Sequence, residues 1–215
     1  MNTLLRSAVL LAVSAGLLGA PSAAALPDHP HEGALAARPG LPQPLRVPAP
    51  HEAVEFFWYD CSHSARLEEP LERWAARHTG EVTLRRIPAI WTGGPDERVQ
   101  TAHARLYYTL ERLGAVDRLQ RQVFTAVHSE HADLTTEDLA AAWAAAQGLD
   151  EGGFRAAYRS AEVDRSVAAV PGLFARYAVD ELPTVVVDGR YRAAPSRAGG
   201  VEGMPAELDR LIEQP

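Results

Sequence analysis

The sequence contains one cysteine and no lysine. Because Cys61 is the only thiol among the 215 residues, no disulfide can form within the chain, and none holds the fold together. All 21 basic residues are arginine, and 28 acidic residues bring the formal net charge to −7. A charge balance of this kind, with no basic cluster, argues against nucleic acid and anionic membrane surfaces as partners.

A long apolar run is also lacking after the first 25 residues. Residues 1–25 combine an early arginine, an apolar stretch and a final run of small residues, which is the pattern of a secretory signal peptide. We expect cleavage near Ala24 or Ala25. No cysteine stands directly after the apolar stretch to carry a lipid, and no later run reaches the ~18 apolar residues that a membrane span needs, so no membrane anchor is expected.

Residues 26–50 are rich in proline and have little apolar patterning. This composition predicts an extended, mostly disordered leader, with a short edge strand near 45–47. Ordered structure is expected to begin near His51.

The apolar pattern after His51 predicts an α/β fold. Val54–Tyr59 is nearly continuously apolar, which suits a central strand buried on both faces. Helical spacing follows at 61–78, where Pro70 should kink the helix. The other predicted elements are strands at 82–87, 184–187 and 191–192, the last two joined by a turn at Asp188-Gly189, and helices at 96–113, 116–129, 136–147, 151–160, 162–178 and 205–213. Because strands flank the helical block on both sides, they should pair in one sheet.

Cys61 lies where the first strand gives way to the first helix, between Asp60 and Ser62. The free N–H groups and the positive dipole end of a helix N-terminus favour the thiolate, which is the nucleophilic form of the sulfur. Asp60 could cap this helix, but its negative charge opposes a thiolate. On balance we predict a reactive sulfur. The alternative is that Cys61 is a small buried apolar side chain.

Two motifs make the chain resemble the thioredoxin-fold thiol:disulfide oxidoreductases of the DsbA type, which are exported to the bacterial periplasm. Glu-Phe-Phe at 55–57 precedes Cys-Ser-His at 61–63, with Glu68-Glu69 on the following helix. Leu-Pro-Thr-Val-Val-Val-Asp-Gly-Arg-Tyr occupies 182–191. The resemblance runs from about Val54 to the C-terminus.

This resemblance implies a fold class and a division of the chain. A thioredoxin-like α/β domain would be made of 51–94 and 179–215, with an inserted all-helical subdomain at 95–178. The chain departs from the family at Ser64, where the family has the second cysteine of Cys-x-x-Cys. The departure puts the family's usual activity in doubt and leaves the fold unaffected.

The resemblance also implies roles for individual residues. His63 matches the histidine that stabilises the thiolate, the alternative being a solvent-facing helix residue. Pro183 matches the family's cis-proline opposite the active-site sulfur, and Leu182 would offer backbone groups to an extended client peptide. Glu55 and Arg86 match a charged pair below the active site, for which proton handling and a structural ion pair are both open interpretations.

Ser64 decides which chemistry is available. It lies three residues after Cys61 on the same helix face, so its hydroxyl can hydrogen-bond the thiolate. It cannot attack a mixed disulfide, because thiol exchange needs a thiolate nucleophile. We therefore predict monothiol exchange through Cys61. Client proteins with thiols or disulfides, glutathione or another small thiol, or a membrane redox partner would supply the second sulfur.

Two other interpretations of the same motif stay open. The chain could be a redox-inactive peptide-binding module or chaperone that keeps the client groove. Alternatively, Ser64 could be an engineered replacement that traps mixed disulfides. No metal or other cofactor is expected, because His128 and His131, like His29 and His31, show only weak metal-ligand spacing with no third ligand.

Overall fold

A computed structural model describes residues 49–214 of the chain. The signal peptide predicted at 1–25, the leader up to residue 48 and the edge strand near 45–47 lie outside the described residues. The described part contains a four-stranded sheet with the strand order β2-β1-β3-β4. Its strands are β1 His51–Phe57, β2 Val82–Pro88, β3 Thr184–Val187 and β4 Tyr191–Ala193.

β1 is the central strand, as its continuous apolar run predicts. It pairs in parallel with β2 and antiparallel with β3, so the strands before and after the helical block form one sheet. This confirms the predicted pairing. β3 and β4 form the predicted hairpin, and Asp188 and Gly189 both have positive φ, at 51° and 68°. A turn with two positive φ angles matches the right-handed twist of the flanking strands.

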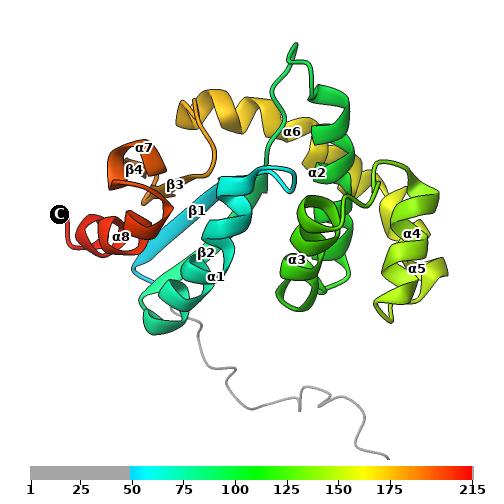
Figure 1. Cartoon of the computed structure of the whole chain (residues 1–215), viewed down its shortest axis with the longest axis horizontal. Helices are drawn as coiled ribbons and strands as arrows, with labels where there is room; N and C mark the ends of the chain where they lie inside the picture. Colours follow the sequence, from blue (N-terminus) through cyan, green and yellow to red (C-terminus); the bar gives the residue numbers. More distant parts are fainter. Residues whose placement is uncertain (1–48, 215) are drawn as a thin grey trace, which may run out of the picture. The chain divides into compact units, whose positions relative to one another are not determined.

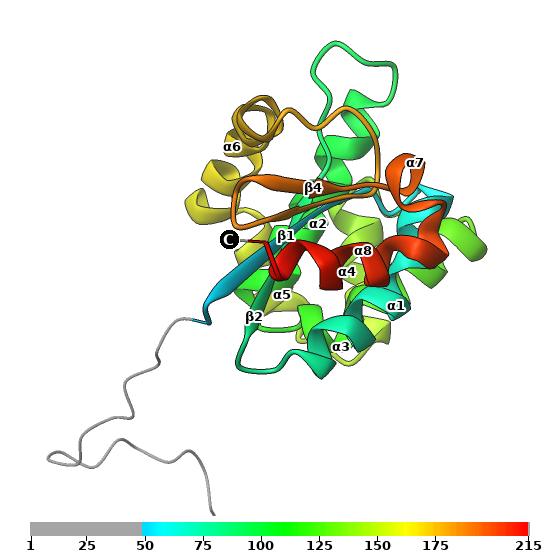
Figure 2. The same ribbon diagram turned by 90° about the vertical axis from the view of Figure 1, so that its left-hand side faces the viewer.

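One face of the sheet is covered by α1 Ser62–Arg77 and α8 Met204–Ile212, which lie together in front of the strands in Figure 2. Leu67, Leu71 and Trp74 of α1 pack with Leu208 of α8 in a continuous buried cluster. α1 runs without interruption through Pro70. Two short elements that the sequence did not predict, α7 Pro195–Ala198 and the 3₁₀ turn η2 Val201–Gly203, lead into α8.

Helices between β2 and β3 cover the other face and extend away from it (Figure 1). Their bounds are α2 Glu97–Arg112, α3 Val116–Phe124, α4 Glu137–Ala146, α5 Glu151–Tyr158 and α6 Ala161–Tyr177. The single helix predicted at 116–129 is wrong in one respect, because its last turn, η1 Thr125–Ser129, is a π-helix. A π turn shifts the hydrogen-bond partners by one residue, and the apolar spacing of the sequence does not reveal that shift.

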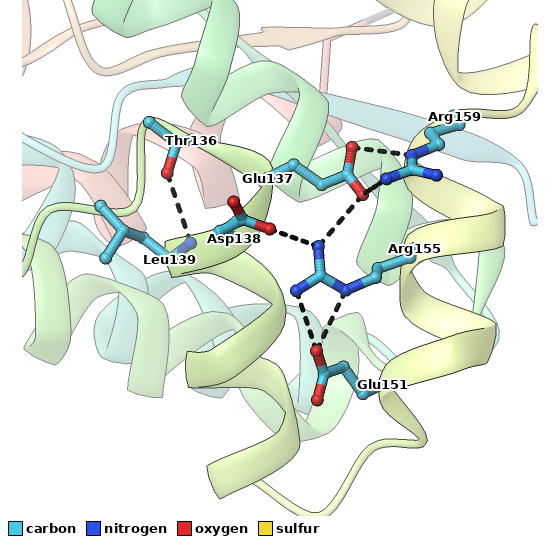
Figure 3. Close-up of polar contacts among 7 residues, drawn as sticks. All are labelled: Thr136, Glu137, Asp138, Leu139, Glu151, Arg155 and Arg159. Atoms are coloured by element: carbon cyan, nitrogen blue, oxygen red, sulfur yellow. Dashed lines mark hydrogen bonds and ion pairs between the residues drawn. The ribbon is translucent and has the colours of Figure 1, made fainter.

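α4 and α5 are joined by an ion-pair network around Arg155 (Figure 3). Its guanidinium reaches Asp138 at 2.6 Å and Glu137 at 3.3 Å on α4, and Glu151 at 2.8 Å on α5. Arg159 adds a second contact to Glu137 at 2.6 Å. Several ion pairs that share one guanidinium stabilise the contact between two helices more than isolated surface pairs do.

The described elements form an α/β fold with a helical block inserted between the strands, which confirms the predicted fold class. The boundaries of the predicted subdomain, 95–178, stay a prediction. Within residues 49–214, no helix combines the length and the apolar character needed to cross a membrane.

Candidate active site

Cys61 is the N-cap residue of α1, so its side chain lies at the positive end of that helix. Its backbone is extended, with φ −98° and ψ 117°, and its side chain is partly exposed. The prediction that Asp60 caps the helix is wrong. Asp60 lies one residue too early and is exposed, because the chain reaches α1 through a turn in which Cys61 N–H donates to the Trp58 carbonyl at 3.0 Å.

The loop before β3 brings Leu182 and Pro183 to the cysteine. The Cys61 thiol donates to the Leu182 carbonyl with an Sγ to oxygen distance of 3.9 Å, across 121 residues of sequence. The Leu182–Pro183 peptide bond is cis, as the resemblance implies. Pro183 is buried, whereas Leu182 is partly exposed beside the sulfur. The backbone of this loop is therefore within reach of a peptide bound at Cys61.

Ser64 and His63 follow Cys61 but lie in different environments. Ser64 is completely buried, and its Oγ accepts a hydrogen bond from the Trp58 N–H at 3.3 Å. The predicted hydrogen bond from Ser64 to a Cys61 thiolate stays a prediction. His63 is exposed and lines a pocket together with Leu182 and Arg66. The side chain at the second cysteine position is thus a structural part of the loop that precedes Cys61.

The indole of Trp58 hydrogen-bonds a histidine, His103, for which the sequence analysis predicted no role. The Trp58 Nε1–H donates to His103 Nδ1 at 3.1 Å. His103 is 3% exposed on α2, and burial lowers the pKa of its imidazole to about 4. The ring is therefore neutral near pH 7 and can accept this bond.

Glu55 and Arg86 are neighbours in the register of β1 and β2, and Arg86 Nε donates to Glu55 Oε2 at 3.2 Å. The predicted pairing is confirmed. Glu68, on the buried face of α1, shares the same arginine, with Arg86 Nη2 at 2.6 Å from its Oε1. From the sequence, Glu68 was noted only as part of the Glu68-Glu69 motif, with no role predicted for it. One guanidinium thus serves two buried carboxyl groups.

This imbalance of charge favours a retained proton. Glu55 is fully buried and Glu68 is 2% exposed. Burial raises the pKa of Glu55 to about 7 and that of Glu68 to about 8, against the opposing effect of Arg86. Among the described residues, the fully buried Glu55 Oε1 has no hydrogen-bond partner, which fits a carboxyl group that carries a proton.

Two further buried polar residues next to this cluster escaped the sequence analysis. Tyr59 and Gln120 are buried beside it, and the Tyr59 hydroxyl donates to Gln120 Oε1 at 2.7 Å. A signal for Gln120 did exist, because it is a polar residue next to Leu119 on the buried face of an amphipathic helix. In residues 49–214 no group of three or more His, Cys, Asp or Glu side chains is arranged to hold a metal ion.

A protein-family model described as a DSBA-like thioredoxin domain matches residues 53–206. The chain belongs to the DsbA-like thioredoxin family. The predicted family is thereby confirmed, and the chain stands among thiol:disulfide oxidoreductases. A thiol:disulfide interchange protein DsbA of Burkholderia cepacia is 33% identical over 215 residues, covering 100% of this chain and 95% of that relative. The protein of the same name from Azotobacter vinelandii is 33% identical over 171 residues, covering 80% of this chain and 78% of that relative.

Solved structures of DsbA proteins have the same fold. The crystal structure of Pseudomonas aeruginosa DsbA superposes with a TM-score of 0.70 at 32% sequence identity, covering 81% of this chain and 88% of that one. DsbA from Xylella fastidiosa gives a TM-score of 0.68 at 27% identity, covering 77% of this chain and 86% of that one.

Proposed function

We propose that the protein is an exported, periplasmic thiol exchange enzyme that acts through Cys61. The observation that carries the proposal is the position of the sulfur. Cys61 lies at a helix N-terminus, partly exposed, 3.9 Å from the carbonyl that precedes the cis-proline. A thiolate at such a position is stabilised by the helix and accessible to a client disulfide.

The exchange has two steps, and neither oxidises or reduces the pair of reactants overall. In the first, the Cys61 thiolate attacks one sulfur of a client disulfide, the client S–S bond breaks, and the other client sulfur leaves as a thiolate that takes a proton. In the second, a thiolate attacks the mixed disulfide, forms a new disulfide with the client sulfur and releases Cys61. The second thiolate is the client's own, which gives isomerisation, or that of glutathione or another small thiol.

Ser64 limits the enzyme to this type of cycle. A hydroxyl does not displace a thiolate from a disulfide, so the chain cannot resolve the intermediate itself. Client proteins with thiols or disulfides are therefore the substrates. Where the client has no second thiol, a small thiol or a membrane redox partner supplies the sulfur that resolves the mixed disulfide. Export to the periplasm is supported by the predicted signal peptide and by the family.

Residues around and beneath Cys61 support the exchange in this proposal. Leu182 offers its backbone to an extended client segment next to the cis Pro183, in the manner of an added strand. His63 stabilises the thiolate through its imidazole. Glu55 shares a proton with Glu68 beneath the site and takes part in proton handling there.

The decisive experiment is turnover of a glutathionylated peptide in the presence of glutathione. We expect release of the peptide thiol to be faster with the protein than with glutathione alone, and to return to the background rate with Cys61→Ala. Ser62→Ala, at the exposed neighbour of Cys61, is the matched control and should keep the rate. Equal rates for the protein and Cys61→Ala would refute the proposal.

A second candidate is a redox-inactive peptide-binding module or chaperone. The observation in its favour is the buried Ser64, which is integrated into the loop through its bond to Trp58. This candidate predicts that an unfolded client binds equally well to the protein and to Cys61→Ala, without any mixed disulfide. Isothermal titration with a reduced, alkylated client measures that binding.

A further inference from the structure

A chain of hydrogen bonds runs from the loop after β1, through Gln120 on α3, to the buried carboxyl pair. It begins at the Tyr59 hydroxyl, which donates to Gln120 Oε1 at 2.7 Å. Gln120 Nε2 then points at Glu68 Oε2, 3.5 Å away, and the other oxygen of Glu68 accepts from Arg86. All of these side chains except that of Arg86 are at most 2% exposed. The helical block between β2 and β3 thus supplies one of the two donors to Glu68.

The direction of this chain is fixed by Tyr59. Burial raises the pKa of its hydroxyl well above the ordinary value, so the phenol keeps its proton and acts as a donor. An amide has one acceptor oxygen and one donor nitrogen. Since the oxygen of Gln120 is occupied by the phenol, its NH₂ group must face Glu68. A donor facing a carboxyl group favours the ionised form of that group.

The two carboxyl groups differ in the donors around them. Glu68 has a donor at each oxygen, Arg86 at 2.6 Å and Gln120 at 3.5 Å. Glu55 has Arg86 at 3.2 Å from one oxygen, and its other oxygen is buried with no partner among the described residues. Ionising both buried acids beside one guanidinium would leave one negative charge without compensation, at a high cost in free energy. The pair therefore retains one proton near neutral pH.

We propose that Tyr59 and Gln120 are positioning residues that favour the ionised form of Glu68, and so reduce the share of the pair's proton that Glu68 holds relative to Glu55. This deepens the proposed thiol exchange, on which its functional meaning rests. Glu68 is seven residues along α1 from Cys61, or roughly 10 Å at 1.5 Å per residue. At that distance in a protein interior, a carboxylate opposes a thiolate, so the titration of the pair enters the pH dependence of Cys61 reactivity.

Other titratable groups act on the pair from the elements packed around it. Arg86 reaches it from β2, Glu72 from the same face of α1, and Tyr107 from α2 acts on Arg86. Tyr59 lies in the loop after β1. The hydrogen bond between Glu72 and Glu68 raises the pKa of Glu68 and so opposes the effect of the Gln120 amide. The variants below leave Arg86, Glu72 and Tyr107 in place.

The test is the ionisation of the two glutamates, followed by carboxyl-carbon NMR of glutamate-labelled protein between about pH 5 and 9. In the natural sequence we expect the two glutamates to share one proton near neutral pH, so that both carboxyl signals move above pH 6. Gln120→Leu removes the donor and should shift the ratio of the two protonated forms toward Glu68 by about three- to tenfold. The inflection in the rate of Cys61 alkylation with iodoacetamide should move with it.

Gln100→Leu is the matched control. Gln100 is also a buried glutamine, 3% exposed on α2, but its Oε1 accepts from the Trp91 N–H, away from the pair. It should leave both glutamate titrations unchanged. Tyr59→Phe deletes a single oxygen, frees the amide of Gln120 to rotate, and should move the ratio in the same direction as Gln120→Leu but less far. It also serves as the test if Gln120→Leu does not fold.

Unchanged glutamate titrations in the folded Gln120 or Tyr59 variants would overturn the proposal. So would an equal shift in Gln100→Leu, because the effect would then follow from the loss of any buried amide. The NMR measurement needs no turnover, so it can fail while peptide deglutathionylation succeeds. A shift seen by NMR with no Cys61-dependent turnover would refute the proposed function and leave the effect of the Gln120 amide on Glu68 in place.

Discussion

At the scale of the residue, the site differs from a dithiol centre by one atom, the oxygen of Ser64. Ser64 is buried one helical turn after Cys61 and accepts a hydrogen bond from the backbone of Trp58. The neighbouring buried acids differ in another way, since their environment is built to retain a proton. Both features can be tested by single substitutions.

Ser64→Cys should restore a dithiol cycle. The two sulfurs would lie three residues apart at a helix N-terminus, the spacing at which an internal disulfide can close. We expect the variant to oxidise a reduced model peptide stoichiometrically after treatment with oxidised glutathione, whereas the natural sequence forms only mixed disulfides. Mass spectrometry under non-reducing conditions distinguishes the two. Persistence of the mixed disulfide in Ser64→Cys would show that the loop holds the two side chains apart.

Glu55→Gln should change how stability depends on pH. The folded carboxyl group holds its proton up to about pH 7, whereas the unfolded one releases it near 4.5. The folded state therefore binds more protons in this window, and stability falls as the pH rises through it. Glu55→Gln has no carboxyl group to titrate, so its free energy of unfolding should not fall in this way. Between pH 5 and 8, the stability of the variant relative to the natural sequence should therefore rise by at most about 3 kcal/mol.

Urea unfolding at the two pH values measures this difference. Glu69→Gln is the control, since Glu69 is exposed on the same helix and pairs with Arg73 in solvent. A pH-independent difference between Glu55→Gln and the natural sequence would contradict the assignment of a buried proton to this carboxyl group.

At the scale of the element, α1 presents the reactive Cys61 at its N-terminus and makes polar contacts with α8 at its C-terminus. His78, the C-cap, lies between Glu81 at 3.0 Å and Asp209 of α8 at 2.9 Å. Trp74 donates to the same Asp209 oxygen at 2.7 Å. The helix that presents Cys61 is thereby attached to the last helix of the described chain.

The His78 contact should weaken as the pH rises. Its bonds to Glu81 and then to Asp209 raise the pKa of the imidazole above the ordinary 6.5. A raised histidine pKa adds stability that is complete below about pH 6.5 and is lost as the pH passes the folded value. His78→Gln should therefore lower the Tm by a few degrees at pH 5.5 and by less at pH 9. Asp209→Asn should flatten the same profile, and an equal loss at both pH values would contradict the prediction.

The contact between α4 and α5 is stabilised by Arg155, whose single guanidinium binds several carboxylates (Figure 3). Arg155→Ala leaves Glu137, Asp138 and Glu151 facing one another with one fewer cation, so we expect a loss of a few degrees in Tm that shrinks in 1 M salt. Arg165→Ala is the control, because Arg165 makes a single contact to Glu162 at 3.9 Å with a side chain 71% exposed. Similar losses for both variants would show that the network adds nothing beyond ordinary surface pairs.

At the scale of the whole molecule, one accessible sulfur determines the products of oxidation. Cys61 is partly exposed, and the chain offers it no second thiol. With a mild oxidant and no client present, we expect a dimer linked through Cys61, reversed by dithiothreitol and absent in Cys61→Ala. Light scattering with and without reductant measures it. A monomer that stays unlinked at high concentration would show that the Leu182 loop shields the sulfur from a second chain.

Much of this molecule can be predicted from short-range sequence patterns. The apolar run at 54–59, the helical spacing after Cys61 and the Asp188-Gly189 turn each give their element directly, because period and turn chemistry are local properties. Glu55 in a strand buried on both faces demands a partner, and Arg86 on the next strand provides it. The sequence alone also excludes an internal disulfide, since it contains one cysteine.

Tertiary structure decided what depends on distant segments meeting. The cis Pro183 loop reaches Cys61 across 121 residues, Gln120 meets Glu68 across 52, and Asp209 meets His78 across 131. No local pattern records these distances, because they follow from how the helices pack on the sheet. The π turn at 125–129 and the N-cap position of Cys61 were also visible only in the structure. The sequence thus determined which chemistry the chain contains, and the packing of α3, α8 and the β3 loop determined which groups share the site.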